Sequence, residues 1–274
     1  MENQSTKQIN IHKVSETEVH QTPDFLAVEE PLQISLTINS NMPPIIDKNI
    51  SITMRTPGAD TDLALGFLFT EGIIFENSQV LKVLFEENKV NVLLNSSKGI
   101  DLSKIERHFY TSSSCGVCGK ASIDAIRTVS RLTPQKVALK IDKNIIKQLP
   151  NTLRQQQAVF ENTGGLHAAA LFSSEGVLLS LREDVGRHNA LDKLIGAAFQ
   201  TNSLPIANSL LLLSGRASFE LIQKAAMAGI QFIMAVGAPS SLAVELAEEF
   251  SITLIGFLSS HRFNIYTNAH RVLI

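Results

Sequence analysis

The sequence of 274 residues contains no tryptophan, two tyrosines and two cysteines. With at most one pair of thiols, the chain cannot be a disulfide-rich secreted scaffold. No apolar run approaches the roughly 20 residues of a membrane-spanning helix. Residues 1–13 are polar and lack the apolar core of a signal peptide. We therefore expect a cytoplasmic protein, in which a cysteine pair is more often catalytic or metal-binding than structural.

An excess of either charge is also missing, because 24 basic and 26 acidic residues give a net charge of −2. No global field attracts nucleic acid or an anionic membrane, so we expect neither as a partner. Hydrophobic residues make up 44% and charged residues 18% of the chain. This composition is typical of a globular enzyme and argues against disorder.

The first half of the chain shows strand patterns. Residues 1–22 are polar, and we expect them to be mobile or loosely attached. For residues 23–110 we predict a small, strand-rich α+β domain, because apolar and polar residues alternate at 32–38 and 50–54. Further strands are expected at 80–85 and 89–94. A helix is expected at 61–71, capped by Asp60 or Thr61 and ending near Gly72.

The second half, residues 123–274, shows an α/β pattern. Two short helices, 145–149 and 153–160, are expected on either side of Pro150, which acts as a stop. Strands predicted at 167–172, 177–181, 210–213, 230–236 and 252–257 are followed by helices at 189–199, 219–228 and 242–250. This alternation predicts a mixed, mostly parallel sheet with helices on both faces.

Both cysteines lie in the segment 111–122, which we treat as a separate cysteine loop. Three serines precede Cys115, Gly116 follows it, and Gly119 and Lys120 follow Cys118. An accessible loop with a nearby positive charge favours a reactive thiolate, and a second thiol can resolve a persulfide or disulfide on the first. The pair alone is also compatible with half of a zinc site, a thioredoxin-type dithiol or two inert thiols.

Two glycine-bearing turns join a predicted strand to a predicted helix. They are Ser214-Gly215-Arg216-Ala217-Ser218 and Gly237-Ala238-Pro239-Ser240-Ser241. Free amide groups and the helix dipole favour an anion at such turns, and a guanidinium suits a phosphate. Ordinary capped turns have the same composition.

Polar residues also gather at the ends of two predicted strands. The segment 182–189 contains arginine, aspartate, histidine and asparagine, a mixture that suits recognition of a polar ligand or a solvated loop. His167 begins an apolar strand, where a hydrogen-bonded core histidine is more common than a ligand-binding one.

Taken together, these motifs resemble the FdhD formate dehydrogenase accessory proteins. The resemblance covers residues 25–270 in the family's order and rests on segments 29–32, 55–58, 64–68, 71–74, 114–119, 163–169, 183–193, 214–216 and 263–267. Such an ordered series is far more specific than one motif. It implies a sulfurtransferase, similar in fold to cytidine deaminases, that forms a homodimer and has no permanent metal.

The resemblance implies a sulfur carrier required for formate dehydrogenase activity. Sulfur would come from a cysteine desulfurase as a persulfide. It would pass to the bis-guanine-dinucleotide molybdenum cofactor before that cofactor enters the formate dehydrogenase apoenzyme. Cys115 would hold the persulfide and Cys118 would assist. The cofactor-binding segment would be Phe263, Asn264, Ile265, Tyr266, Thr267 and Asn268, although histidine is usual in the family at the last position.

Two other classes of function compete with a sulfur carrier. A zinc-dependent deaminase needs a glutamate two positions after its metal-binding histidine and a cysteine pair downstream. Here Ala169 stands two positions after His167, and the cysteines lie upstream. A cofactor-binding chaperone without catalysis is the second alternative.

Overall fold

A computed structural model describes residues 5–39, 46–95, 139–157, 160 and 163–274. The described chain forms a mixed α/β structure with several sheets, as the sequence predicts. The cysteine loop predicted at residues 111–122, with Cys115 and Cys118, lies outside these ranges. So do the two domain boundaries predicted on either side of it.

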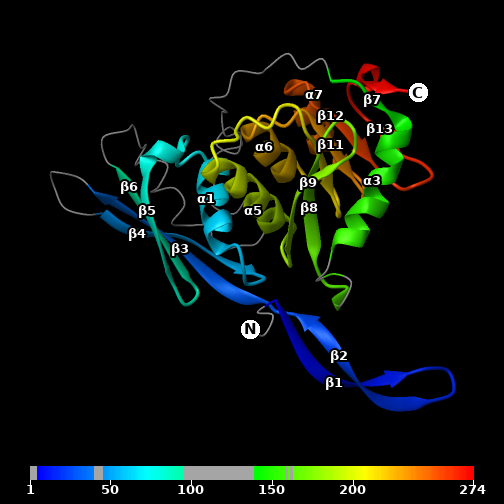
Figure 1. Ribbon diagram of the computed structural model, residues 1–274, viewed down its shortest axis with the longest axis horizontal. Coiled ribbons are helices and arrows are strands. Elements are labelled where there is room, and N and C mark those ends of the chain that lie inside the picture. Colours follow the sequence, from blue (N-terminus) through cyan, green and yellow to red (C-terminus); the bar gives the residue numbers. More distant parts are fainter. Residues whose placement is uncertain (1–4, 40–45, 96–138, 158–159, 161–162) are drawn as a thin grey trace.

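The chain begins with a hairpin that the sequence analysis missed. Strands β1 (Thr6–Val14) and β2 (Val19–Ala27) pair in antiparallel fashion, and Figure 1 shows them extending away from the rest of the molecule. Most of its side chains are exposed, apolar and polar alike, and this hides the strand signal, since alternation is visible only where one face is buried. Ser5 attaches its base, because its hydroxyl donates to the carbonyl of Pro57 over 3.1 Å.

A four-stranded sheet follows, in the order β4-β3-β6-β5. Its strands are β3 (Glu30–Asn39), β4 (Ile46–Arg55), β5 (Val80–Glu86) and β6 (Lys89–Asn95), with the short helix η1 (Asn77–Gln79) before β5. The four strands predicted in this part of the chain are confirmed. Leu32, Ile34 and Leu36 are at most 1% exposed, which shows why the alternation there is strict.

Helix α1 (Asp60–Thr70) lies between this sheet and the second half. The predicted helix is confirmed, and Gly72 follows its end in the left-handed conformation at φ 69°. The predicted cap is wrong, because Ala59 occupies the N-cap position without a side-chain hydrogen bond. Asp60 instead accepts two hydrogen bonds from Arg55, over 3.0 and 3.1 Å.

The central sheet has the order β13-β12-β11-β10-β8-β9. Its strands are β8 (His167–Phe172), β9 (Leu178–Asp184), β10 (Leu210–Leu213), β11 (Phe232–Ala235), β12 (Thr253–Gly256) and β13 (Asn264–Ile265). A separate two-stranded sheet is formed by β7 (Ile141–Asp142) and β14 (Val272–Leu273), which pair in parallel. The short helix η4 (Ala269–Arg271) directly precedes β14.

The expectation of a mostly parallel sheet is wrong. Strand β11 is parallel to β10 and to β12, whereas the β10–β8, β8–β9 and β12–β13 pairings are antiparallel. The connections from β8 to β9 and from β12 to β13 are too short for a crossover, so these strands must be antiparallel. The strand–helix alternation that predicts parallel pairing holds only from β10 to β12.

Helices cover both faces of the central sheet, as predicted. One face packs against α5 (Arg187–Gln200), α6 (Phe219–Met227) and α7 (Ser241–Glu249), and the other against α3 (Lys143–Gln156). The stop predicted at Pro150 is wrong, because α3 continues through it. Ile146, Leu149 and Leu153 are buried at helical spacing on both sides of the proline, so their packing outweighs the lost hydrogen bond.

Helices α1 and α5 cross in close contact at two glycines. A Cβ atom built at Gly66 would lie 1.9 Å from the carbonyl oxygen of Asp192, and one at Gly196 would lie 1.8 Å from that of Asp62. One hydrophobic core continues across this crossing, from the four-stranded sheet to the central sheet. The crossing therefore fixes the position of α5.

Candidate functional site

Polar residues converge at one edge of the central sheet. The parallel strands β10, β11 and β12 all end at this edge, where ligands collect in open α/β sheets. Because β8 runs in the opposite direction, it begins there with His167, which lies opposite Asp184 at the end of β9. The edge therefore brings together the polar residues that the sequence analysis identified at 167, 182–189 and 214–216.

The turn from β10 to α6 is fixed to the start of β8. The hydroxyl of Ser214 accepts a hydrogen bond from the amide of Ala168 over 2.8 Å. A Cβ atom at Gly215 would lie 3.2 Å from Nδ1 of His167, so glycine lets the turn approach the imidazole. Arg216, the next residue, is exposed and has no hydrogen bond or ion pair to any described residue. This turn presents a cation at the edge.

The turn from β11 to α7 packs against the first turn. The amide of Gly237 donates to the carbonyl of Gly215 over 3.0 Å, and a Cβ atom at Gly237 would lie 3.0 Å from Cα of Arg216. Ser240 caps α7 by accepting a hydrogen bond from the amide of Ala243 over 3.2 Å. The capped-turn interpretation thus holds for this second turn.

Two histidines lie at the edge, each beside a different turn. Nε2 of His188 is 2.9 Å from a carboxylate oxygen of Glu220 and 3.4 Å from the hydroxyl of Ser218. Burial, with the charges of Arg187 and His188, lowers the pKa of His167, which Asp184 only partly opposes. His167 is therefore neutral at pH 7.

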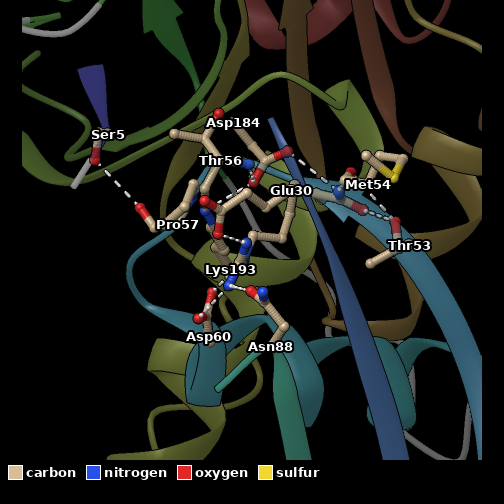
Figure 2. A network of polar contacts seen from close by, with 12 residues as sticks. Ser5, Glu30, Thr53, Met54, Thr56, Pro57, Asp60, Asn88, Asp184 and Lys193 are labelled. Carbon is tan, nitrogen blue, oxygen red and sulfur yellow. Dashed lines mark hydrogen bonds and ion pairs between the residues drawn. The ribbon is translucent and has the colours of Figure 1, made fainter. Parts of the chain in front are cut away.

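A buried network holds the segment 184–189 in place, and Figure 2 shows it. The carboxylate of Asp184, at 0% exposure, lies 2.7 Å from Nζ of Lys193, which is 3% exposed. It also accepts hydrogen bonds from Thr56 N over 3.2 Å, Gly186 N over 2.8 Å and Asn189 Nδ2 over 3.1 Å. Asp184 is thus a fully engaged structural group rather than a ligand for a substrate.

The same network reaches the first half of the chain. Lys193 donates to the carbonyl of Thr56 over 2.8 Å, and the hydroxyl of Thr56 accepts from the amide of Val185 over 3.2 Å. Arg55, 2% exposed, bridges Asp60, Glu30 and Asn88 next to it. Thr56 and Lys193 lie in segments that carry the family resemblance, but the sequence assigned neither residue a role in the site. A signal exists for Lys193, which with Asp192 interrupts the apolar face of α5.

A second buried ion pair ties three helices behind the edge. Nζ of Lys224 in α6 lies 2.9 Å from a carboxylate oxygen of Asp192 in α5 and 2.9 Å from the hydroxyl of Thr70 in α1. Burial lowers the pKa of Lys224, but the charges of Asp192 and Glu71 raise it overall. The ammonium therefore remains charged and ties the last turn of α6 to the middle of α5 and to the end of α1.

The predicted cofactor segment, residues 263–268, forms the outer strand β13 and the turn after it. Phe263 and Ile265 are partly buried against the core, and Asn264 is exposed. The ring of Tyr266 lies over Gly256 at the end of β12, where a Cβ atom would be 3.0 Å from its Cε2. Tyr266 is only partly buried and lies near the candidate edge.

The last two residues of this segment have structural partners. The hydroxyl of Thr267 donates to the carbonyl of Ile252 over 2.6 Å and accepts from the amide of Leu254 over 2.9 Å. Nδ2 of Asn268 donates to the same Ile252 carbonyl over 3.0 Å, at a φ of 52°. These contacts attach the segment to the start of β12, away from the candidate edge.

Cys115 and Cys118 lie outside the described residues. Within the described ranges, no group of three or more histidine, cysteine, aspartate and glutamate side chains is arranged to hold a metal ion. Likewise, none of the described helices has the length and apolarity needed to cross a membrane.

Comparisons with known proteins place the whole chain among relatives. A model of the FdhD/NarQ family matches residues 27–273. The sulfur carrier protein FdhD of Streptomyces avermitilis is 46% identical over 280 residues, which cover 98% of this chain and 96% of that protein. The protein of the same name from Sulfolobus acidocaldarius is 40% identical over 267 residues, covering 97% and 98%.

A solved structure has a similar fold. It is that of a candidate formate dehydrogenase accessory protein from Desulfotalea psychrophila, with a TM-score of 0.72. The alignment covers 98% of this chain and 99% of that one at 21% sequence identity. At this identity, the likeness establishes the overall fold.

Proposed function

Because the chain belongs to the FdhD/NarQ family, we propose that it is a sulfur carrier that serves the maturation of formate dehydrogenase. The observation that carries this proposal is the 46% identity over 98% of the chain to a relative named sulfur carrier protein FdhD. The name of the structural neighbour, a candidate formate dehydrogenase accessory protein, supports the same role.

The proposed reaction uses the cysteine pair. Cys115 receives sulfane sulfur from a cysteine desulfurase and carries it as a persulfide, and Cys118 assists. The recipient is the bis-guanine-dinucleotide molybdenum cofactor, which is cargo and then enters the formate dehydrogenase apoenzyme. We place this reaction in the cytoplasm and in a homodimer, as the family resemblance implies.

The candidate edge supports a nucleotide-bearing recipient. Tyr266, which is only partly buried, offers an aromatic ring for a base, and the turn after β10 offers amide groups and a cation. Thr267 and Asn268 hold the segment in place rather than contact the recipient, because their polar groups are used by β12. The cofactor contacts proposed for this segment therefore concentrate on Phe263, Asn264 and Tyr266.

The deaminase alternative has little support in the described residues. Ala169 occupies the position of the required glutamate and is fully buried within β8, so it offers no acid or base beside His167. We also propose, from the family resemblance alone, that the second half is similar in fold to cytidine deaminases.

Mass analysis after incubation with a cysteine desulfurase and cysteine tests the carrier proposal. The wild-type chain should gain sulfur in a form that a thiol reductant removes, Cys115→Ala should gain none, and Cys118→Ala should keep the persulfide on Cys115. Undiminished persulfide in Cys115→Ala contradicts the role of that residue. A double-cysteine variant that still activates formate dehydrogenase would identify a chaperone instead.

A further inference from the structure

Helix α3 carries three cationic side chains and no carboxylate. Lys143, Lys147 and Arg154 lie within about 40° of one another around the helix and span about 16 Å along it. Their side chains form no hydrogen bond or ion pair with any described residue. A second row, next to this one, consists of exposed neutral amides at Asn144, Gln148, Asn151 and Gln155. We call the three cations the α3 stripe.

The α3 stripe opposes the local preferences of a helix. Lys143 is the first residue of α3, where the helix dipole favours an acidic side chain, yet the first turn contains no acid. Lys147 follows one turn later, so two like charges are neighbours at a spacing that lowers helix stability. Because the described chain offers these charges no compensating contact, the pattern points to a partner outside it.

The carboxylates near α3 do not neutralise the stripe. Asp142 caps the helix, because its side chain accepts a hydrogen bond from the amide of Asn144 over 2.7 Å. Glu175 lies in the turn between β8 and β9, where a Cβ atom at Gly176 would be 3.1 Å from Ile145. Ile145 is two residues after Lys143 and therefore faces the other side of the helix. The stripe thus presents an uncompensated positive charge to solvent.

The surroundings of the stripe favour a protein as its occupant. The apolar residues of α3, Ile146, Leu149 and Leu153, are buried against the central sheet, so the helix has no free apolar face to insert into a membrane. Leu273, 47% exposed, lies opposite Asp142 and borders the start of the stripe. Apolar contacts beside charges are typical of protein interfaces. A second copy related by a two-fold axis through the stripe would place cations opposite cations.

We propose that the α3 stripe docks the protein that donates sulfur, through an acidic surface of that protein. The inference rests on the proposed function, in which the donor is a cysteine desulfurase. In the sequence, the segment that carries Cys115 and Cys118 leads into Leu139, β7 and α3, so a donor on α3 is held beside the chain that leads to the acceptor thiols. The formate dehydrogenase apoenzyme must instead approach the candidate edge, whereas α3 covers one face of the sheet, as Figure 1 shows.

Biolayer interferometry tests the docking, with the cysteine desulfurase of the mass analysis immobilised. We compare the wild-type chain with Lys143→Glu/Lys147→Glu, with the charge-preserving Lys143→Arg/Lys147→Arg, and with Lys82→Glu/Lys89→Glu as a matched control. Lys82 and Lys89 belong to the four-stranded sheet, far from α3 in Figure 1, so the control makes the same charge change elsewhere. Thermal unfolding of each variant confirms that it is folded.

Reversal of both charges should lower the association rate about tenfold or more and leave the dissociation rate nearly unchanged, because exposed charges act on the encounter. The arginine pair and the control pair should bind as the wild type does. Wild-type association should slow as salt is added, since salt screens exposed charges. In the mass analysis, Lys143→Glu/Lys147→Glu should gain persulfide slowly at low desulfurase concentration and at the wild-type rate when the desulfurase is saturating.

An unchanged association rate in Lys143→Glu/Lys147→Glu, or an equal loss in the control pair, overturns the docking surface. If that variant keeps desulfurase binding but loses binding to phosphatidylglycerol vesicles, or changes its mass by light scattering, the occupant is a membrane or a second copy instead. Binding is also measured in Cys115→Ala, where it should persist. A wild-type chain that gains no persulfide loses its proposed function, while interferometry still decides the docking.

The opposite failure is equally distinct. A chain that gains persulfide at the wild-type rate at every desulfurase concentration, with both charges reversed, keeps its proposed function and loses this docking surface.

Discussion

Breaking the buried pair between Asp184 and Lys193 should destabilise the fold strongly, and the losses caused by removing each partner should not be additive. The two charged groups are 2.7 Å apart, at 0% and 3% side-chain exposure. Removal of one member of a buried pair costs about 3–5 kcal/mol, because the other charge stays buried. Three further hydrogen bonds to Asp184 survive in Lys193→Met, so we expect about 3 kcal/mol for that variant.

The reciprocal variant and the double variant complete a thermodynamic cycle. Asp184→Asn leaves the ammonium of Lys193 with carbonyl acceptors alone and should cost about 4 kcal/mol. The double variant removes both charges, so its loss should fall short of the sum by about 2 kcal/mol or more.

Urea denaturation of the folded chain, followed by circular dichroism, measures these free energies of unfolding. Lys82→Met is the control, because Lys82 is exposed on β5 and should change stability by no more than about 0.5 kcal/mol. Strictly additive losses, or a loss in Lys193→Met equal to that of Lys82→Met, would refute the structural role of the pair.

Three further predictions concern the crossing, the histidine and the outer strand. Gly196→Ala should lower the free energy of unfolding by about 3 kcal/mol, because its Cβ atom would meet the backbone of Asp62 at 1.8 Å; Gly165→Ala, whose nearest contact would be 3.7 Å, should be near neutral in the same urea experiment. The imidazole of His167 should titrate by NMR with a pKa below 6.5, so its contribution to stability is intact above that pH and is lost as the pH falls through the folded pKa. A midpoint above 6.5 contradicts the environment described for the ring. Thr267→Val leaves the buried amide of Leu254 without its acceptor and should cost about 1–3 kcal/mol in thermal unfolding, whereas Thr201→Val at an exposed helix end should not.

Strands with strong burial were predictable from the sequence. The bounds of β8 and β10 match the prediction, because apolar runs bounded by polar turn residues define them. The hairpin β1–β2 was not predictable by the same reasoning, because most of its side chains are exposed, apolar ones such as Val14 and Val19 included, so no buried face marks the strands. Pro150 misled the prediction of α3 because tertiary packing overrode a local preference.

The candidate site was predictable in its parts but not in its pairings. The turn after β10 and the polar run at 182–189 were visible as sequence patterns, and the sheet brings them to one edge. The pairing of carboxylates with cations depends on contacts between residues that lie apart in the sequence. Lys193, for example, contacts Asp184, 9 residues away, and Thr56, 137 residues away. From the sequence pattern alone, Asp184 could equally be a ligand for a substrate. Only the folded contacts show that its carboxylate is fully engaged.

The glycine contact between α1 and α5 has a consequence for exchanging parts between relatives. Each helix carries one glycine whose missing side chain makes room for the backbone of the other, so neither position accepts alanine alone. A chimera that takes residues 30–95 from one family member and residues 163–274 from another should assemble only if both donors keep this close crossing. The two halves are therefore complementary at this crossing. A chimera that takes the candidate edge and α5 from one relative, but α1 from a relative without the close crossing, should not fold.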